Sequence, residues 1–272
     1  MVNSINTNTS AAIGLQRLSS NRNSLETTQS HISSGKKINS PKDDAATLAI
    51  AQELLATFSG TEAVRDGLNR ATATIDVALA AGQSSADLLV EMKGLAVQAS
   101  QEGLDQTSRD ALNSAFNALR DQIVSINDSA EFAGSNLIAA GAADQDILSD
   151  EDGNRITVKA QDFSTGGLGV GGLALDSAGN AATALSALDA AITDASGKLA
   201  ELGSSGQRIE THNELLGIQN DTLRAGIGNL VDADMAAESA ALQAGQIKES
   251  LAIVSLSIAN AAPSNMLALF GG

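Results

Sequence analysis

Core-type residues recur at alternating intervals of three and four positions between Leu185 and Leu230, and the alternation never slips. This is the heptad pattern of a helix that packs along one seam. A continuous helix of this length is about 70 Å long, and its apolar stripe needs partner helices to cover it. The seam positions are Leu185, Leu188, Ile192, Ala195, Leu199, Leu202, Gly206, Ile209, Asn213, Leu216, Asn220, Leu223, Ile227 and Leu230.

The same spacing predicts three further helices, which supply the partners. Residues 45–100 carry a seam at Val64, Leu68, Ala71, Ile75, Ala78, Gly82, Leu89, Met92, Ala96 and Ala99. After a break at Gly103, a third helix carries Leu112, Phe116, Leu119, Ile123, Ile126 and Ala130. Beyond a break at Val231–Asp234, the last helix carries Ala240, Ala244, Ile247, Leu251, Val254, Ile258 and Ala261.

Residues 1–40 are rich in Ser, Asn and Thr, yet they keep a thinner seam at Ala11, Leu15, Leu18, Arg22, Leu25, Gln29 and Ile32. We expect this segment to be largely disordered on its own, because burial of so few apolar side chains does not offset the conformational entropy lost when the helix forms. Gly35 suits the end of this helix, and Pro41 with Asp43 and Asp44 suits the start of the next. Both ends of the chain therefore offer a seam, and we expect the two seams to pair with each other.

Residues 133–180 lack the heptad pattern. Ile147-Leu148 and Ile156-Thr-Val158 flank Asp152-Gly153, which predicts a short β-hairpin, and Gly166–Gly172 reads as a flexible loop. The predicted fold is mainly α: an elongated antiparallel helical bundle or coiled coil with a small hairpin region and with its termini paired as a coiled coil.

Composition narrows the function classes. Trp, Tyr and Cys are absent, and the net charge is −16. The strong negative charge does not favour binding to nucleic acid or to an anionic membrane, and the absence of Cys excludes disulfides. The opening residues lack a secretory signal pattern, and no apolar run reaches spanning length. These features alone predict a cytoplasmic protein.

Candidate chemical motifs favour structural interpretations. Gly167-x-Gly169-x-x-Gly172 matches the dinucleotide pattern, but the chain is not a series of βαβ units. A calcium loop centred on Gly153 would place Leu148 and Lys159 where acidic ligands are required. His31 and His212 form no triad pattern, and the aspartate pairs 43/44 and 232/234 sit where helix capping is more common. The sequence thus predicts no catalytic residue, no cofactor, no metal and no enzyme.

Both ends of the chain resemble the signatures of bacterial flagellins, particularly the short alphaproteobacterial type. The N-terminal resemblance lies in Ser4-Ile-Asn-Thr-Asn8 and in Ile32-Ser-Ser-Gly-Lys-Lys-Ile-Asn-Ser-Pro-Lys-Asp-Asp-Ala-Ala-Thr-Leu-Ala-Ile50. The C-terminal resemblance lies in Asn229-Leu-Val-Asp-Ala-Asp-Met-Ala-Ala-Glu-Ser239, Leu256-Ser-Ile-Ala-Asn260 and Leu267-Ala-Leu-Phe270.

The resemblance implies an extracellular filament protein for swimming motility that polymerises with itself. Export through the flagellar type III apparatus uses no cleaved signal peptide, so the resemblance overrides the cytoplasmic prediction. It also implies an export chaperone, hook-associated proteins and a filament cap as partners. We expect a terminal coiled-coil domain of residues 1–40 and 235–272, and a rod domain of residues 41–234 with an insert at about 133–180. A hook–filament junction protein, which forms a short ring, is the alternative.

The expected mechanism is folding coupled to assembly, in which the termini order when seams between subunits are buried. The residues expected to form the polymerisation seam are Leu15, Leu18, Leu25, Ile32, Ile247, Leu251, Val254 and Ile258.

Two further expectations follow from the resemblance. Glu91-Met-Lys-Gly-Leu-Ala-Val-Gln98 matches the stretch by which immunostimulatory flagellins engage a vertebrate Toll-like receptor, with Glu91, Lys93, Leu95 and Gln98 at the equivalent places. Glu91 and Gly94 replace an arginine and a glutamate there, so we expect weak or no activation. O-glycosylation is common in the family, and the candidate residues are Ser164, Thr165, Ser177 and Thr183.

Overall fold

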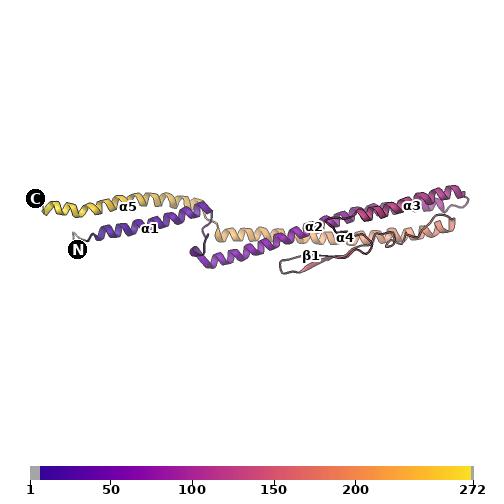
Figure 1. Ribbon diagram of the computed structural model, residues 1–272, viewed down its shortest axis with the longest axis horizontal. Coiled ribbons are helices and arrows are strands. Elements are labelled where there is room, and N and C mark those ends of the chain that lie inside the picture. The colour runs from indigo at the N-terminus through magenta and orange to yellow at the C-terminus, as the bar shows by residue number, and fades with distance from the viewer. Residues whose placement is uncertain (1–6, 271–272) are drawn as a thin grey trace. The chain divides into compact units, whose positions relative to one another are not determined.

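A computed structural model describes residues 7–270, with side chains for residues 7–262. Within this range the chain forms five helices and one hairpin, as Figure 1 shows. The elements are α1 (Thr9–Ser34), α2 (Pro41–Ala99), α3 (Gln106–Ser129), β1 (Gln145–Leu148), β2 (Arg155–Val158), α4 (Ala178–Val231) and α5 (Met235–Phe270). The predicted fold class, a mainly helical protein with a small hairpin, is confirmed.

Residue contacts divide the chain into two compact units. The terminal unit comprises Met1–Ala56 and Thr222–Gly272, and the rod unit comprises Thr57–Asp221. Residues 1–6 and 271–272 of the expected terminal domain lie outside the described residues, as do the first three residues of the Ser4–Asn8 motif and the side chains of the Leu267–Phe270 motif.

The core of the rod unit follows the predicted seams of α2, α3 and α4. Every α2 seam residue from Val64 to Ala99 is buried, and in α3 Phe116 and Ile123 are fully buried. On α4 no predicted seam residue is exposed, and Leu188, Leu202 and Ile209 are fully buried. The heptad pattern therefore predicts both the helices of the rod and the faces that they bury.

Turn chemistry separates these helices where it was expected. Gly103 takes a left-handed conformation with φ of 89° between α2 and α3. The Asp105 carboxylate then accepts a hydrogen bond from the Ser108 N–H at 2.9 Å and so caps α3. The buried Arg109 donates to the Ala99 carbonyl at the end of α2, so one guanidinium satisfies an orphan carbonyl of the preceding helix.

The predicted hairpin is confirmed. β1 pairs antiparallel with β2, with Gln145 opposite Val158 and Leu148 opposite Arg155. Gly153 has a positive φ of 94° at the tip, next to Asp152 as expected. Ile147 and Val158 are buried and belong to the rod core, so the hairpin is anchored through one face.

The glycine-rich stretch 166–172 is a loop, as expected, but the expectation that it is flexible does not match its contacts. Leu168 and Val170 are buried in the rod core. The ammonium group of Lys198 donates to the Asp162 carbonyl at 2.7 Å and to the Gly167 carbonyl at 3.2 Å. The buried apolar residues between the glycines therefore hold the loop against the rod core.

The helix boundaries of the terminal unit match the predicted signals. Gly35 ends α1 in the left-handed conformation, and its N–H donates to the His31 carbonyl. α2 begins at Pro41, and the extended backbone of Asp44 separates a first turn from regular helix. Asp234 caps α5 by accepting from the N–H groups of Ala236 and Ala237.

Candidate assembly interface

Helices α1 and α5 pack side by side in antiparallel orientation, which confirms that the two ends of the chain pair (Figure 1). Near one end the Asn8 side chain donates to the Ala259 carbonyl at 2.7 Å. At the other end His31 Nδ1 lies 2.8 Å from a carboxylate oxygen of Glu238. We call α1 and α5 together the terminal pair.

The covered face of α1 differs in part from the predicted seam. Leu18 and Leu25 are each only 7% exposed, and Ala11 and Ile32 are half-buried. Between these four residues, however, the helix covers Gly14, Asn21 and Thr28, while the predicted Leu15, Arg22 and Gln29 are exposed. Half of the heptad is therefore shifted by one residue toward smaller side chains.

The covered face of α5 also differs from the predicted seam. The predicted residues Ala240, Ala244, Ile247, Leu251, Val254, Ile258 and Ala261 are all exposed. The face toward α1 follows another perfect heptad of buried and half-buried residues: Glu238, Leu242, Gly245, Glu249, Ala252, Leu256 and Ala259. The expectation that the larger aliphatic residues of α5 face α1 is therefore wrong.

Close helix approach explains both shifts. An ideal Cβ on Gly245 would lie 2.5 Å from Leu25 Cδ2, and one on Gly14 would lie 3.3 Å from Leu256 Cδ1. Each leucine therefore occupies space that a larger residue would fill on the opposite helix. The Asn21 amide also donates to the Gly245 carbonyl at 2.9 Å. Small and polar residues thus form a close, thin seam.

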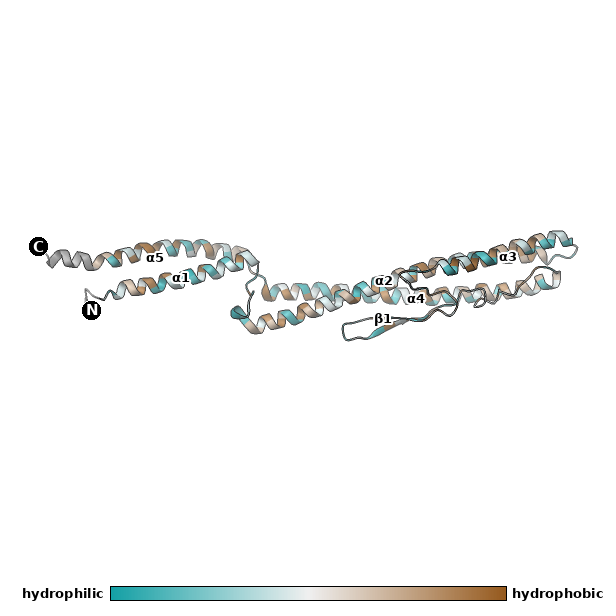
Figure 2. Cartoon of the chain, in the orientation of Figure 1, coloured by the Kyte–Doolittle hydropathy of each residue, from teal (hydrophilic) through white to brown (hydrophobic). Residues whose placement is uncertain are grey.

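The opposite face of α5 carries an uncovered aliphatic stripe, which we call the α5 stripe: Ile247, Leu251, Val254 and Ile258. These side chains are 57–68% exposed. Figure 2 shows hydrophobic residues along much of the described length of α5. A contiguous exposed apolar surface of this kind marks an interaction site. The chemistry available to this surface is burial against another apolar surface.

The two linkers of the terminal unit are hydrogen-bonded to each other. The Lys37 N–H donates to the Val231 carbonyl at 2.7 Å, and the Ala233 N–H donates to the Gly35 carbonyl at 2.9 Å. The Lys37 ammonium also donates to the Asn229 carbonyl. Because the break after α1 is joined to the break before α5, these bonds fix the start of the terminal pair.

Capping interactions set the electrostatics of the same region. The N–H groups of Asn39 and Ser40 donate to the Asp43 carboxylate and hold its pKa below the ordinary value. The hydroxyl and N–H of Thr47 lower the pKa of Asp44 in the same way. Both carboxylates therefore stabilise the turn that enters α2.

The receptor-equivalent residues lie along α2 in the rod unit. Glu91 and Gln98 are exposed, and Leu95 is half-buried against the core. Lys93 forms an ion pair with Asp189 of α4. Apart from the adjacent residues and the backbone of its own helix, no atom lies within 4 Å of the place where a side chain of residue 94 would begin, so Gly94 leaves this surface without a contact group.

The candidate glycosylation residues differ in accessibility. Ser177 and Thr183 are exposed near the start of α4. Ser164 and Thr165 are half-buried, the first accepting from the Gly167 N–H and the second accepting at its carbonyl from Val170. A modifying group would therefore reach the first two hydroxyls more readily.

The remaining candidate motifs form hydrogen bonds within the fold. The Asp150 carboxylate accepts from the side-chain amide and from the backbone N–H of Asn154 at the hairpin tip, and these bonds hold its pKa below the ordinary value. His212 Nε2 lies 2.6 Å from the Ser149 carbonyl. Over residues 7–262 no three His, Asp or Glu side chains gather in a metal-binding arrangement. Among the described helices, none is long and apolar enough to cross a membrane.

Sequence comparisons agree with the resemblance at both ends. The bacterial flagellin N-terminal helical region matches residues 5–143, and the bacterial flagellin C-terminal helical region matches residues 185–270. Flagellin FljM of Caulobacter vibrioides is 43% identical, over 99% of this chain and 99% of its own length. A flagellin of Brucella melitensis is 31% identical over the same shares of both chains.

A comparison of structures supports the fold alone. A flagellar hook-associated protein from Vibrio parahaemolyticus superposes with a TM-score of 0.60 at 14% identity, covering 70% of this chain and 100% of that chain. An identity this low does not favour the hook-junction alternative, whereas the full-length relatives are named flagellins.

Proposed function

This chain belongs to the bacterial flagellin family and is a structural subunit of the extracellular flagellar filament, and we propose that burial of the α5 stripe between copies drives its polymerisation. The supporting observation is the exposure of Ile247, Leu251, Val254 and Ile258 on a helix whose other face already packs against α1. The family is structural, and we infer that this chain has no enzymatic activity of its own.

The energetics favour the α5 stripe as the driving surface. Complete burial of an aliphatic side chain contributes about 1.5 to 3 kcal/mol, and four such side chains lie on the stripe. This gain has to outweigh the repulsion between chains of net charge −16. The predicted seam residue Leu15 is exposed and extends the apolar surface onto α1, while Leu18, Leu25 and the half-buried Ile32 hold the terminal pair together.

We infer that folding of the terminal pair is coupled to assembly. Half of the covered seam residues within the pair are Gly, Ala, Asn or Thr, so the seam buries less apolar area for the residues that it orders than a fully aliphatic seam would. Residues 1–40 and 235–272 then form the domain that orders as the filament grows, and residues 41–234 form the preassembled rod. A pair that is easily opened also suits passage through a narrow export channel.

We propose that a different face of the neighbouring copy covers the α5 stripe, so that the contact between copies is heterologous. A heterologous contact that does not close on itself produces an open helix. This geometry yields a filament of unlimited length.

Charge substitutions test the proposal. Leu251→Asp and Leu15→Asp are expected to abolish seeded filament growth in negative-stain electron microscopy, because a buried unpaired carboxylate opposes assembly. Ser257→Asp is the matched control, since Ser257 is exposed on a more polar face of α5. Circular dichroism should show that the rod stays helical in all three variants. Normal filaments from Leu251→Asp would contradict the proposal.

Family membership also supports proposals about partners. We infer that the type III export apparatus, an export chaperone, hook-associated proteins and a filament cap act on this chain, and that nucleic acid and membranes do not bind it. We further infer weak or no Toll-like receptor activation, because Glu91 and Gly94 remove the expected contacts. A potent reporter-cell response would contradict this inference.

O-glycosylation is proposed at Ser177 and Thr183 ahead of Ser164 and Thr165, following their exposure. The intact mass of filament protein from its native cell is expected to exceed the sequence mass. A mass equal to the sequence mass would exclude the modification.

A further inference from the structure

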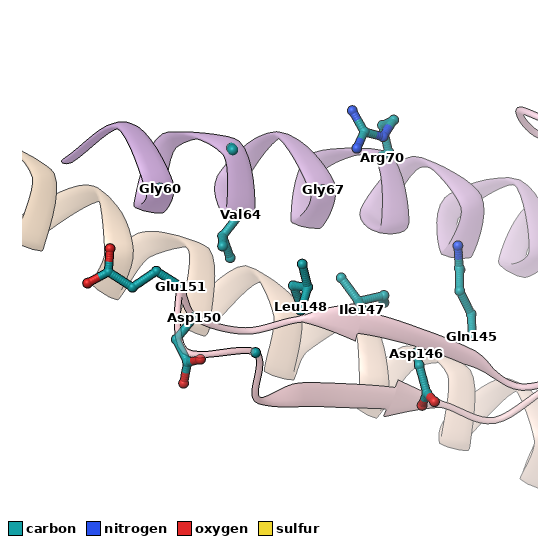
Figure 3. Close-up of a pocket in the computed structure, with 12 residues that line it drawn as sticks. Gly60, Val64, Gly67, Arg70, Gln145, Asp146, Ile147, Leu148, Asp150 and Glu151 are labelled. Carbon is teal, nitrogen blue, oxygen red and sulfur yellow. The ribbon is translucent and has the colours of Figure 1, made fainter. Parts of the chain in front are cut away.

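The hairpin of the rod unit has a groove on each side. The first, which we call the α2 groove, lies between α2 and β1 and has a volume of about 520 Å³ (Figure 3). Its lining residues on α2 are Gly60, Ala63, Val64, Gly67 and Arg70, and the rest come from residues 145–153. Val64 points toward Ile147 and Leu148 across the groove (Figure 3).

Small residues create the apolar floor of the α2 groove. Gly60, Ala63 and Gly67 are spaced three and four residues apart, so they share one face of α2. The wall opposite is β1, where Leu148 is 45% exposed. The groove therefore presents apolar surface in a form that an inserted aliphatic side chain would cover.

The second groove, which we call the α4 groove, lies on the β2 side of the hairpin. Its lining residues are Ile156, Ser204, Gln207, Arg208, Thr211, His212 and Leu215. Leu215 is 57% exposed although it belongs to the long rod helix, and Ile218 lies nearly one turn further along at 61%. This side of the rod therefore carries projecting aliphatic side chains.

The two grooves also differ in charge. Asp146, Asp150 and Glu151 line the α2 groove against the single positive charge of Arg70. Arg208 supplies the permanent charge in the lining of the α4 groove. Among the described side chains neither Glu151 nor Arg208 takes part in an ion pair. The α2 groove is therefore lined mainly by acidic side chains, whereas the α4 groove carries the basic Arg208 and the exposed Leu215.

We propose that these two sides form one contact between rods of neighbouring copies, in which Leu215 of one copy enters the α2 groove of the next. Arg208 then faces Glu151 of that copy. The occupant of the groove is a second copy because this chain itself carries the complementary surface, in both shape and charge. The two surfaces differ, so the contact is heterologous and repeats without closing.

This contact deepens the proposed function and rests on it. The α5 stripe supplies apolar burial between terminal pairs, whereas the groove contact aligns the rods. Opposite charges at an interface fix register and reduce repulsion, which matters for a chain of net charge −16.

Cysteine cross-linking tests the contact directly, because the natural chain contains no cysteine. Full-length Ala63→Cys and Leu215→Cys proteins are mixed, polymerised on seeds, oxidised mildly and separated on a non-reducing gel. A disulfide forms only when the two Cα atoms approach within about 7 Å. We expect a covalent dimer in the mixture and little or none from either protein polymerised alone.

The matched control pairs Ala63→Cys with Thr193→Cys, since Thr193 is exposed on the same helix but lines neither groove. Dimer formation in the control mixture equal to that with Leu215→Cys would overturn the proposal.

A charge exchange gives a second readout. Arg208→Glu and Glu151→Arg are each expected to raise the critical concentration for polymerisation about tenfold, and the double variant is expected to restore it. Arg224→Glu and Asp152→Arg are the controls, because these exposed residues line neither groove. Equal helicity of all variants by circular dichroism shows that they are folded.

The outcomes separate the two proposals. A wild-type chain that forms no filaments contradicts the proposed function, and the groove contact with it. Wild-type filaments without the Ala63–Leu215 dimer and without rescue by the double variant contradict the groove contact alone.

Discussion

The rod unit and the terminal pair are built from the same heptad repeat, but the terminal pair leaves the large aliphatic residues of its predicted α5 seam uncovered. In the rod, Leu68, Ile75 and Leu188 are fully buried between helices of one chain. In the terminal pair, Leu251 and Ile258 project from the face of α5 opposite α1. The repeat thus predicts that a helix has partners, and the sizes of its residues indicate where the partners lie.

Side-chain size is distributed differently around the helices of the two regions. Rod helices place most of their bulky apolar residues inward, where Phe116, Leu68 and Leu188 are fully buried. Helix α5 places Gly245, Ala252 and Ala259 inward beside two half-buried leucines, and its β-branched residues outward. We therefore expect the rod to be stable as a single chain and the terminal pair to need neighbouring copies.

The largest expected effect is the loss of rod stability when a substitution creates a cavity in the rod core. Phe116→Ala removes a fully buried ring from the rod and is expected to destabilise it by about 3 to 5 kcal/mol. Leu251→Ala should change monomer unfolding by less than about 0.5 kcal/mol, because the side chain is 64% exposed. Urea denaturation followed by circular dichroism measures both.

In polymerisation the order of the two effects should be reversed, so that Leu251→Ala has the larger effect. Leu251→Ala is expected to raise the critical concentration of polymerisation, whereas Phe116→Ala should affect it only through the folded fraction. Equal destabilisation of the monomer by both variants would contradict the distinction between the regions.

A smaller effect is expected at the close approach of α1 and α5. Ala is a better helix former than Gly by about 1 kcal/mol, so Gly226→Ala, where the added Cβ would meet no atom outside its own stretch of helix within 4 Å, should stabilise its helix. Gly245→Ala should lose this gain because the added Cβ meets Leu25. Thermal unfolding of filaments measures the difference, and equal stabilisation by both variants would show that the helices do not approach closely.

The smallest effect is a pH dependence in the rod. The N–H and hydroxyl of Ser108 lower the pKa of Asp105 below its ordinary value of 3.8. The cap therefore stabilises α3 above that value, and the stabilisation is lost as the pH falls through the lower folded pKa. The difference in melting temperature between wild type and Asp105→Ala should shrink on acidification.

The Asn variant serves as the control for this prediction, since Asn caps helices without titrating. The melting temperature of Asp105→Asn should lack the part of the acid dependence that comes from this site. A gap between wild type and Asp105→Ala that stays constant down to about pH 2.5 would exclude the cap as its source.

Most of the rod could be predicted from sequence because local and long-range signals agree there. Large aliphatic residues mark the buried faces, and Gly103 and Gly153 mark turns that need positive φ. The register of the terminal pair could not be predicted, because Gly14, Asn21 and Gly245 resemble core residues only when two backbones already lie close together.

The assembly surfaces were harder to predict for a related reason. The residues Ile247 to Ile258 were recognised as a seam, but periodicity does not say whether a seam faces the same chain or another copy. The two grooves could not be predicted from the sequence, because they require the hairpin to lie beside α2 and α4. A stripe of small residues such as Gly60, Ala63 and Gly67 was the available signal.

Amide hydrogen exchange, compared between monomer and filament, tests the central claim most directly. Peptides from α1 and α5 should exchange rapidly in the monomer and become protected in the filament, whereas peptides from the buried seam of the rod should be protected in both. Protection of α5 that is already complete in the monomer, or that stays absent in the filament, would contradict assembly through the α5 stripe.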